Sequence, residues 1–210
     1  MPTAPVRPLP PPRKRRAARD EATRETLKPE AWIDAATEVL VDQGIDHVRV
    51  DVLATQLKVT RGSFYWHFRD REELLRRVLQ AWSERSTENL TKRLESAHPD
   101  PREQLRDVLS LPFRGRAAVR GARIELAIRA WARRDAMARH AVDESDASRL
   151  AYIAQIFSSL GFPVVEAQQR AFAVYAYVVG ESLMASQGSA SQRAERQKFM
   201  ERLALAALTP

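Results

Sequence analysis

Apolar residues recur at spacings of three and four along most of the chain, from Pro29 to the C-terminus. This spacing gathers them on one side of a helix, and no stretch shows the sustained alternation with β-branched enrichment that is typical of a strand. The first helix is bounded by Pro29 and by Gly44, a glycine expected to adopt the left-handed conformation. The pattern therefore predicts an all-α protein. Later helices are expected at about residues 50–57, 71–94, 102–111, 120–134, 136–160, 164–187 and 192–208.

Polar caps and chain breaks mark the ends of the longer helices. Asp70 and Glu73 have the spacing of a capping box before the helix at 71–94. Asp135 is expected to cap the helix at 136–160, and the run Gly161–Phe162–Pro163 predicts that this helix stops and a new one starts.

A very short helix is predicted within "TRGSFYWHF", residues 60–68. Three residues separate it from the helix at 50–57, and Thr60 is expected to cap it. Two short helices joined in this way form a helix-turn-helix. Phe64 and Phe68 share one helical face and are expected in the core, with Arg61 and Tyr65 on its flank.

The opposite face of this helix points outward and carries Gly62, Ser63 and Trp66, with His67 toward the other flank. Such a face suits the major groove of DNA, because glycine permits close backbone approach and arginine can donate twice to guanine. Tyr65 is expected to contact a thymine methyl group or a phosphate, and Ser63, Trp66 and His67 to contact phosphates. Two alternatives stay open: the rings merely pack a three-helix unit, and His67 bonds to a neighbouring backbone group.

Residues 60–68 resemble the recognition helix of the TetR family of transcriptional regulators, which commonly reads small polar, Lys or Arg, Gly, Ser or Thr, apolar, Tyr, aromatic or polar, His, Phe. The resemblance extends over residues 30–80 and includes "GIDHVRVDVLATQLKVTRGSFYWHFRDREELLRRVL". It implies base contacts from Arg61, Gly62 and Tyr65. Family members often place Ser or Thr where this chain has Arg49, so Arg49 is expected to reach a phosphate, and the capping role is vacant unless Asp51 fills it. The DNA-binding set is then Arg49, Thr60, Arg61, Gly62, Ser63, Tyr65, Trp66, His67 and Arg71.

The resemblance also implies a division into a helix-turn-helix domain at 29–75 and a helical ligand-binding and dimerisation domain at 76–210. In that family the last two long helices of two subunits form a four-helix bundle. Apolar residues occupy more of the surface of the helix at 164–187 than one neighbouring helix of the same chain would bury. Purely intramolecular packing stays an alternative. The expected homodimer interface comprises Phe172, Tyr175, Val179, Leu183, Phe199 and Leu203.

The middle helices are implied to enclose a pocket for a small-molecule effector of unknown identity. Candidate lining residues are Trp82, Leu90, Ile124, Ile128, Trp131, Tyr152 and Ile156, each of which would also suit the core. Glu125 and Arg129 stand four residues apart, as either a surface ion pair or a buried orienting pair would.

Charge is concentrated at the start of the chain. The net charge is +7, and residues 1–19 hold six basic residues and no acidic one. The same segment is rich in proline, so an extended, mobile, disordered arm is expected at 1–28. Such an arm either follows DNA phosphates or the minor groove, or is a solubilising tail, or is a proline-rich ligand for a partner domain.

Composition excludes several classes of function. The chain has no cysteine and only four scattered histidines, so no metal and no cofactor is expected. No glycine-rich phosphate loop follows a strand, and Glu72 and Glu73 lie side by side on a solvated helix end, so no catalytic residues are expected. No apolar run reaches the length of a membrane span and no secretory signal is present, which predicts a cytoplasmic protein without a membrane partner.

The resemblance thus implies a ligand-responsive transcriptional regulator, expected to act as a repressor. It would bind a palindromic double-stranded DNA operator as a homodimer and be released by a small molecule in the C-terminal domain. Two other functions stay open: a sequence-nonspecific or architectural DNA-binding protein that uses the basic arm, and a helical small-molecule-binding enzyme.

Overall fold

A computed structural model of the chain describes residues 27–184 and 188–206, and these residues form helices and no strand. The all-α prediction is confirmed. The elements are α2 (Pro29–Gln43), η1 (Ile45–His47), α3 (Val50–Gln56), α4 (Arg61–Phe64), α5 (Arg71–Ser83), η2 (Glu84–Glu88), α6 (Asn89–Ala97), α7 (Pro101–Ser110), η3 (Leu111–Phe113), α8 (Gly115–Ala132), α9 (Ala136–Ser159), α10 (Val164–Leu183) and α11 (Ala190–Leu205). Residues 1–26 of the predicted basic arm, and the predicted helical residues 185–187 and 207–208, lie outside the described residues. The predicted arm ends too late, because Leu27 packs against the core of the first helices and Lys28 is the N-cap residue of α2.

The first helices pack around the aromatic stretch. Phe64 and Phe68 are buried as predicted, and their rings stack with centroids 5.2 Å apart. The Trp32 ring of α2 meets Phe64 edge-on at 5.4 Å. Gly44 ends α2 with a φ of 84° but a ψ of 172°, so its φ is positive as predicted while its ψ is extended rather than left-handed helical.

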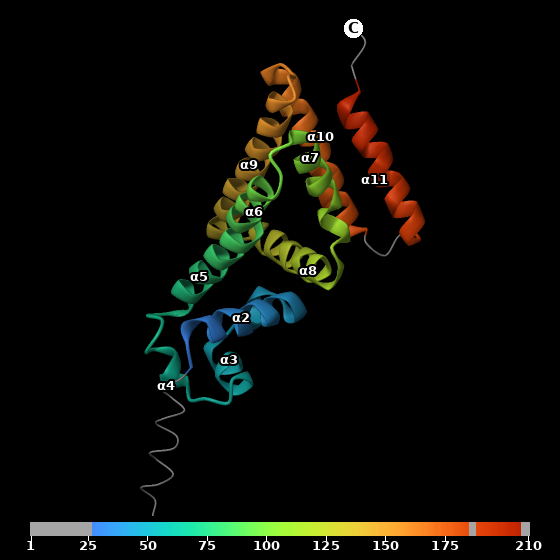
Figure 1. Cartoon of the computed structure of the whole chain (residues 1–210). Helices are drawn as coiled ribbons and strands as arrows, with labels where there is room; N and C mark the ends of the chain where they lie inside the picture. Colours follow the sequence, from blue (N-terminus) through green and yellow to red (C-terminus); the bar gives the residue numbers. More distant parts are fainter. Residues whose placement is uncertain (1–26, 185–187, 207–210) are drawn as a thin grey trace, which may run out of the picture.

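This core continues past the predicted domain boundary at residue 75. Ile128 and Trp131 of α8 and Val142 of α9 are buried in one cluster with Trp32 and Phe64. The cause is the position of α8, which lies along α2 between the first helices and the rest of the chain (Figure 1). The N-terminal unit is therefore seated on α8 and α9 through a shared apolar contact.

The helix predicted at 71–94 continues to Ala97 as α5, η2 and α6, and we call these three elements together the connector helix. Between α5 and α6 it adopts a π-helical segment, η2, which sequence periodicity did not predict. Asp70 caps α5, because its Oδ1 accepts from the Glu73 N–H at 2.8 Å. The Glu73 carboxylate accepts from the N–H of Arg69 rather than from that of Asp70, so the predicted capping box is only half formed.

The α9–α10 turn has the predicted stop signal in full. Gly161 adopts a φ of 92°, its N–H donates to the Ser158 carbonyl, and the Phe162 N–H donates to the Phe157 carbonyl. The Phe162 and Phe157 rings then meet edge-on at 5.8 Å. These are the two hydrogen bonds and the apolar contact of a Schellman motif.

α11 packs beside α10 and α7 (Figure 1). The buried Arg170 of α10 donates to the carbonyls of Ala204 and Ala206 at the end of α11, at 2.5 and 2.6 Å. The buried Glu181 carboxylate accepts from Arg196 of α11. Charged side chains thus hold α11 to α10 near its middle and at its C-terminal end, which fixes its direction.

Acidic residues one turn apart tie the first helices to the rest of the chain. Along α2, Asp34 accepts from Arg85 of η2 at 3.1 Å, Glu38 from Arg120 of α8, and Asp42 from Arg123 of α8 at 2.8 Å. We refer to these three contacts as the α2 ion pairs. Side chains in all three are about half exposed, so each pair contributes little stability, and together they add to the apolar contact that holds α2 against α8 and η2.

Candidate nucleic-acid interface and ligand cavity

The turn between α3 and α4 is closed by a second Schellman motif. The Val59 N–H donates to the Ala54 carbonyl and the Lys58 N–H to the Thr55 carbonyl. Lys58 takes the left-handed position with a φ of 56°, the sole described residue other than glycine with a positive φ. Side chains disfavour this conformation, so the turn is strained at Lys58.

The exposed side of α4 and its exit presents a guanidinium, a bare backbone and two rings. Tyr65 is 60% exposed and Trp66 84% exposed, and no hydrogen bond or ion pair joins Arg61 to another described residue. A Cβ added at Gly62 would meet only the Thr60 Oγ1 at 3.7 Å, an ordinary contact. Nothing within the described protein therefore requires glycine at this position, although alanine favours a helix more.

Two predictions for this stretch are wrong, those for Ser63 and Thr60. Ser63 is 2% exposed and its Oγ is buried without a described partner, so it does not face outward. α4 ends at Phe64, and the single turn is seated so that Ser63 and Phe64 both face the core. The Thr60 side chain makes no capping hydrogen bond. The His67 Nε2 is buried and bonds to no described residue, so a phosphate or backbone contact would have to come from the other ring nitrogen, and the role of His67 stays a prediction.

The two flanking arginines have partners within the protein. Arg49 pairs with Asp51 at 2.7 Å and is 61% exposed, and this hydrogen bond lowers the pKa of Asp51. No side chain caps α3, so Asp51 does not fill that role. The Arg71 Nε donates to the Val48 carbonyl at 2.6 Å and its Nη2 to the Ile45 carbonyl at 2.8 Å. The phosphate contacts of both arginines stay predictions, and Arg71 also holds α5 to the segment before α3.

A cavity of about 680 Å³ lies among α2, the connector, α8, α9 and α10. Four of the predicted pocket residues line it: Trp82, Leu90, Ile124 and Tyr152. Ile128, Trp131 and Ile156 do not line it, because they are buried in the two apolar clusters on either side. Small residues leave the space open on the α8 side, namely Ala117, Ala118, Gly121 and Ala122. Thr37 of α2 also lines the cavity, so it borders the N-terminal unit directly.

A hydrogen-bonded group of charged residues forms one end of this cavity. Arg149 donates five hydrogen bonds, to Glu125, Tyr175, Ser86 and Thr87. Arg129 joins Glu125 at 2.8 Å and pairs with both Asp146 oxygens at 2.6 and 2.9 Å. Of the two readings of the Glu125–Arg129 spacing, the partly buried pair is the one observed. Sequence spacing alone did not reveal that Asp146, Arg149 and Tyr175 complete the group, since they come from two other helices.

Tyr175 belongs to this inner group rather than to an outer surface. Its hydroxyl donates to the Asp146 Oδ1 at 2.6 Å and accepts from Arg149 at 2.9 Å. Burial raises the pKa of Tyr175 to about 12. Burial opposes ionisation of Asp146 as well, but hydrogen bonds from Arg129 and Tyr175 outweigh it and lower the pKa of that carboxyl. The prediction that Tyr175 lies in a dimer interface is wrong in its direction, because the side chain points into its own chain.

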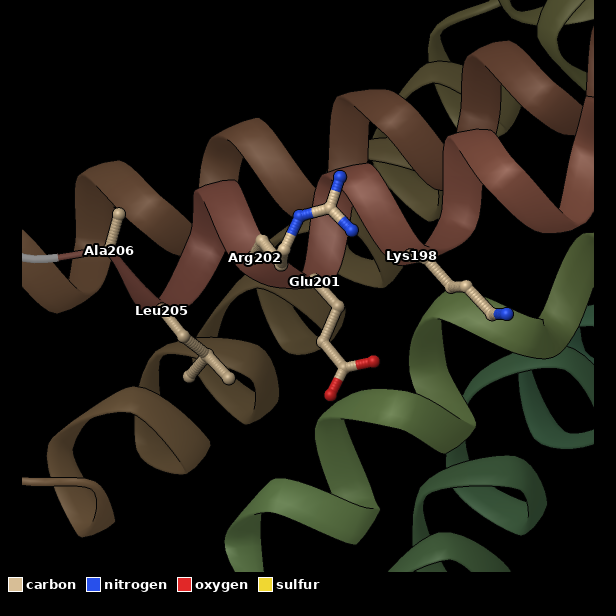
Figure 2. Close-up of a pocket in the computed structure, with 5 residues that line it drawn as sticks. All are labelled: Lys198, Glu201, Arg202, Leu205 and Ala206. Carbon is tan, nitrogen blue, oxygen red and sulfur yellow. The ribbon is translucent and has the colours of Figure 1, made fainter.

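The other predicted interface residues lie on the open sides of α10 and α11. Phe172 is 65% exposed, Phe199 57% and Leu203 52%. Leu183 is half exposed, and both it and Val179 also line the cavity. Figure 2 shows a hollow lined by the last part of α11 and by Ala206, where Glu201 points toward α7. The Glu201 carboxylate pairs with Arg106 of α7. Phe172, Phe199 and Leu203 thus leave large apolar side chains exposed on α10 and α11.

Among the described residues, no three or more His, Cys, Asp or Glu side chains are grouped to hold a metal ion. Nor does any helix in the described ranges have the length and apolar character that crossing a bilayer requires.

Comparisons with known proteins bear on both parts of the chain. Residues 33–78 match the model of the bacterial regulatory proteins, tetR family. The HTH-type transcriptional regulator SrpR of Pseudomonas putida is 42% identical over 66 residues, which are 31% of this chain and only 29% of the length of SrpR. A transcriptional regulator from Rhodococcus sp. Rha1 has a TM-score of 0.66 at 20% identity over 85% of this chain and 94% of its own. The regulator FadR from Bacillus subtilis, solved with stearoyl-CoA, has a TM-score of 0.60 at 19% identity over 87% of this chain and 100% of its own.

Proposed function

We propose that this chain, whose residues 33–78 match the tetR family of bacterial regulatory proteins, is a ligand-responsive repressor that binds a palindromic operator as a homodimer. A small molecule in the helical part would release it from DNA. The observation that carries the proposal is the exposed set Arg61, Gly62 and Tyr65, held from behind by the buried Phe64 and Phe68.

Three features of that set favour a nucleic-acid partner. Two large rings, Tyr65 and Trp66, are left in water next to an arginine without a described partner. Gly62 has no packing reason to be glycine, whereas a base edge or phosphate approaching α4 would exclude a side chain there. An arginine at the start of a helix in the major groove can donate twice to guanine, and Tyr65 can pack on a thymine methyl group.

Dimerisation would supply what one short helix lacks. A single α4 buries too little surface for a specific site, while two copies related by a twofold axis meet successive major grooves. The uncovered apolar residues Phe172, Leu183, Phe199 and Leu203 support an interface made by α10 and α11 of two chains. The cavity beside α2 supports an effector site, as does the small-molecule complex of the B. subtilis regulator of the same fold.

The test is DNA binding by the full chain to the DNA that flanks its own gene, with random DNA as competitor. Arg61→Ala and Tyr65→Ala are each expected to lose about 1–3 kcal/mol of operator binding, because each removes a base contact. Arg102→Ala on α7 is the matched control, since it removes an exposed arginine from the far end of the molecule.

Equal operator affinity of the wild type, Arg61→Ala and Tyr65→Ala would contradict the proposal. Binding that random DNA competes away as well as operator DNA would instead favour the sequence-nonspecific alternative, in which the basic segment at 1–19 supplies the affinity.

A further inference from the structure

The charged residues that line the cavity are nearly all of one sign. They are Arg85, Arg114, Arg120, Arg129 and Arg149 against a single acid, Glu125. Four of these arginines have carboxylate partners that do not line the cavity. The pairs are Arg85 with Asp34, Arg114 with Asp107, Arg120 with Glu38 and Arg129 with Asp146. Each such pair turns its positive end toward the cavity and its negative end away. Where these arginines stay accessible, the cavity wall therefore favours an anion over a cation.

The charged side chains at the inner end of the cavity are already paired with one another, so a charge on the ligand would find no partner there. The Arg149 side chain is 14% exposed and that of Glu125 18% exposed. All five N–H groups of Arg149 are engaged, and Glu125 accepts from Trp82, Arg129 and Arg149. The charges there balance within the group. What this end offers a ligand is apolar wall, from Trp82, Tyr152, Ile153 and Val178.

The outer end is different, because its arginines stay accessible. The side chains of Arg85 and Arg120 are each 56% exposed, and each is held by one carboxylate of α2. Thr37 stands between those two carboxylates on α2 and also lines the cavity. A ligand that fills the cavity therefore ends beside two guanidinium groups whose partners belong to the N-terminal unit.

We propose that the effector is an apolar molecule with one anionic group, a carboxylate or similar anion, which pairs with Arg85 and Arg120 while its apolar body lies against Trp82 and Tyr152. The inference rests on the proposed function and specifies its effector. The ligand anion competes with Asp34 and Glu38 for the same arginines. Binding therefore weakens two of the three α2 ion pairs and loosens the seat of the DNA-binding unit on α8.

The test uses three probes of one shape and different charge: 2-naphthoate, 2-naphthylmethanol and 2-naphthylmethylammonium. Their dissociation constants are measured by calorimetry on the full chain. Naphthoate is expected to bind at least about tenfold more tightly than the alcohol, and the ammonium compound most weakly. Added salt is expected to weaken naphthoate binding and leave alcohol binding unchanged.

Variants locate the anion site. Arg85→Gln and Arg120→Gln are each expected to weaken naphthoate about tenfold without changing the affinity for the alcohol. Arg123→Gln is the matched control, because Arg123 makes an α2 ion pair with Asp42 but does not line the cavity. It is expected to bind naphthoate like the wild type.

Two results would overturn the proposal. One is that naphthoate fails to bind at millimolar concentration, or binds no better than the alcohol and the ammonium compound. The other is that Arg85→Gln and Arg120→Gln bind naphthoate as Arg123→Gln does. Operator binding without ligand is measured in parallel, so a chain that selects naphthoate but ignores its operator would refute the proposed function and leave the ligand class standing.

Discussion

Replacing Lys58 by glycine is expected to stabilise the protein. Lys58 is the C′ residue of the Schellman motif that ends α3, and its φ of 56° forces its Cβ into an unfavourable position. A left-handed residue with a Cβ costs about 1–2 kcal/mol. Glycine removes that cost but adds about 0.5–1 kcal/mol through the greater freedom of the unfolded chain. The net gain for Lys58→Gly is then about 0.5–1 kcal/mol.

Thermal and urea unfolding are measured for Lys58→Gly, Lys58→Ala and the wild type at one protein concentration. For a chain of this length the gain corresponds to a rise in the unfolding midpoint of about 1–4 °C. Lys58→Ala is the matched control, because it removes the same charge and keeps the Cβ that causes the strain. Both hydrogen bonds of the motif come from backbone groups, so they persist in either variant. If Lys58→Gly and Lys58→Ala unfold at the same midpoint, strain at this turn is not stored as argued.

Two further substitutions test other contacts. Arg71→Met is expected to lower the free energy of unfolding by about 1–3 kcal/mol, because the carbonyls of Val48 and Ile45 lose a charged donor, whereas Arg76→Met breaks only an exposed pair with Glu72 and should cost at most about 0.5 kcal/mol. Arg71→Lys separates the predicted phosphate contact of Arg71, measured by gel shift, from its structural role in holding the two carbonyls, measured by thermal unfolding. Unchanged stability of Arg71→Lys would argue against the structural role. Tyr175 has its pKa raised to about 12 from 10.0, so the stability gained by keeping it neutral is complete below pH 10 and falls as pH rises toward 12. The midpoint difference between the wild type and Tyr175→Phe should therefore shrink over that range, and parallel pH profiles would contradict this.

Local signals in the sequence were sufficient for most of the helix boundaries. Pro29, Asp135 and Gly161 act through a fixed φ, a side-chain cap and a positive φ, and each effect depends on neighbours a few residues away. The burial of Phe64 and Phe68 followed from their spacing for the same reason. Ser63 was misplaced because α4 is a single turn, and the tilt of so short a helix is set by what it packs on.

The pattern of apolar and polar residues could not predict contacts between side chains that are far apart in the sequence. Nothing near Tyr175 in sequence indicates that its hydroxyl meets Asp146, because that contact depends on how α9 and α10 cross. The acidic halves of the α2 ion pairs could be recognised from the sequence. Asp34, Glu38 and Asp42 repeat every fourth residue on a helix whose other side is apolar, which indicates a line of charge, but their arginine partners lie 51 to 82 positions away.

The π-helical segment η2 determines which way half of the connector faces. Five cavity-lining residues of this helix stand four positions apart, at Val78, Trp82, Ser86, Leu90 and Leu94, and Ala81, Arg85 and Thr91 line the cavity beside them. In an unbroken α-helix each such step overshoots a full turn by about 40°, so Leu94 would end up about 160° away from Val78, on the reverse side. The wider turn at η2 absorbs one residue and takes back about 100° of that drift. One irregular turn thus keeps five side chains aimed at a single chamber, and deleting one residue there would swing Leu90 and Leu94 out of it by about a quarter of a revolution.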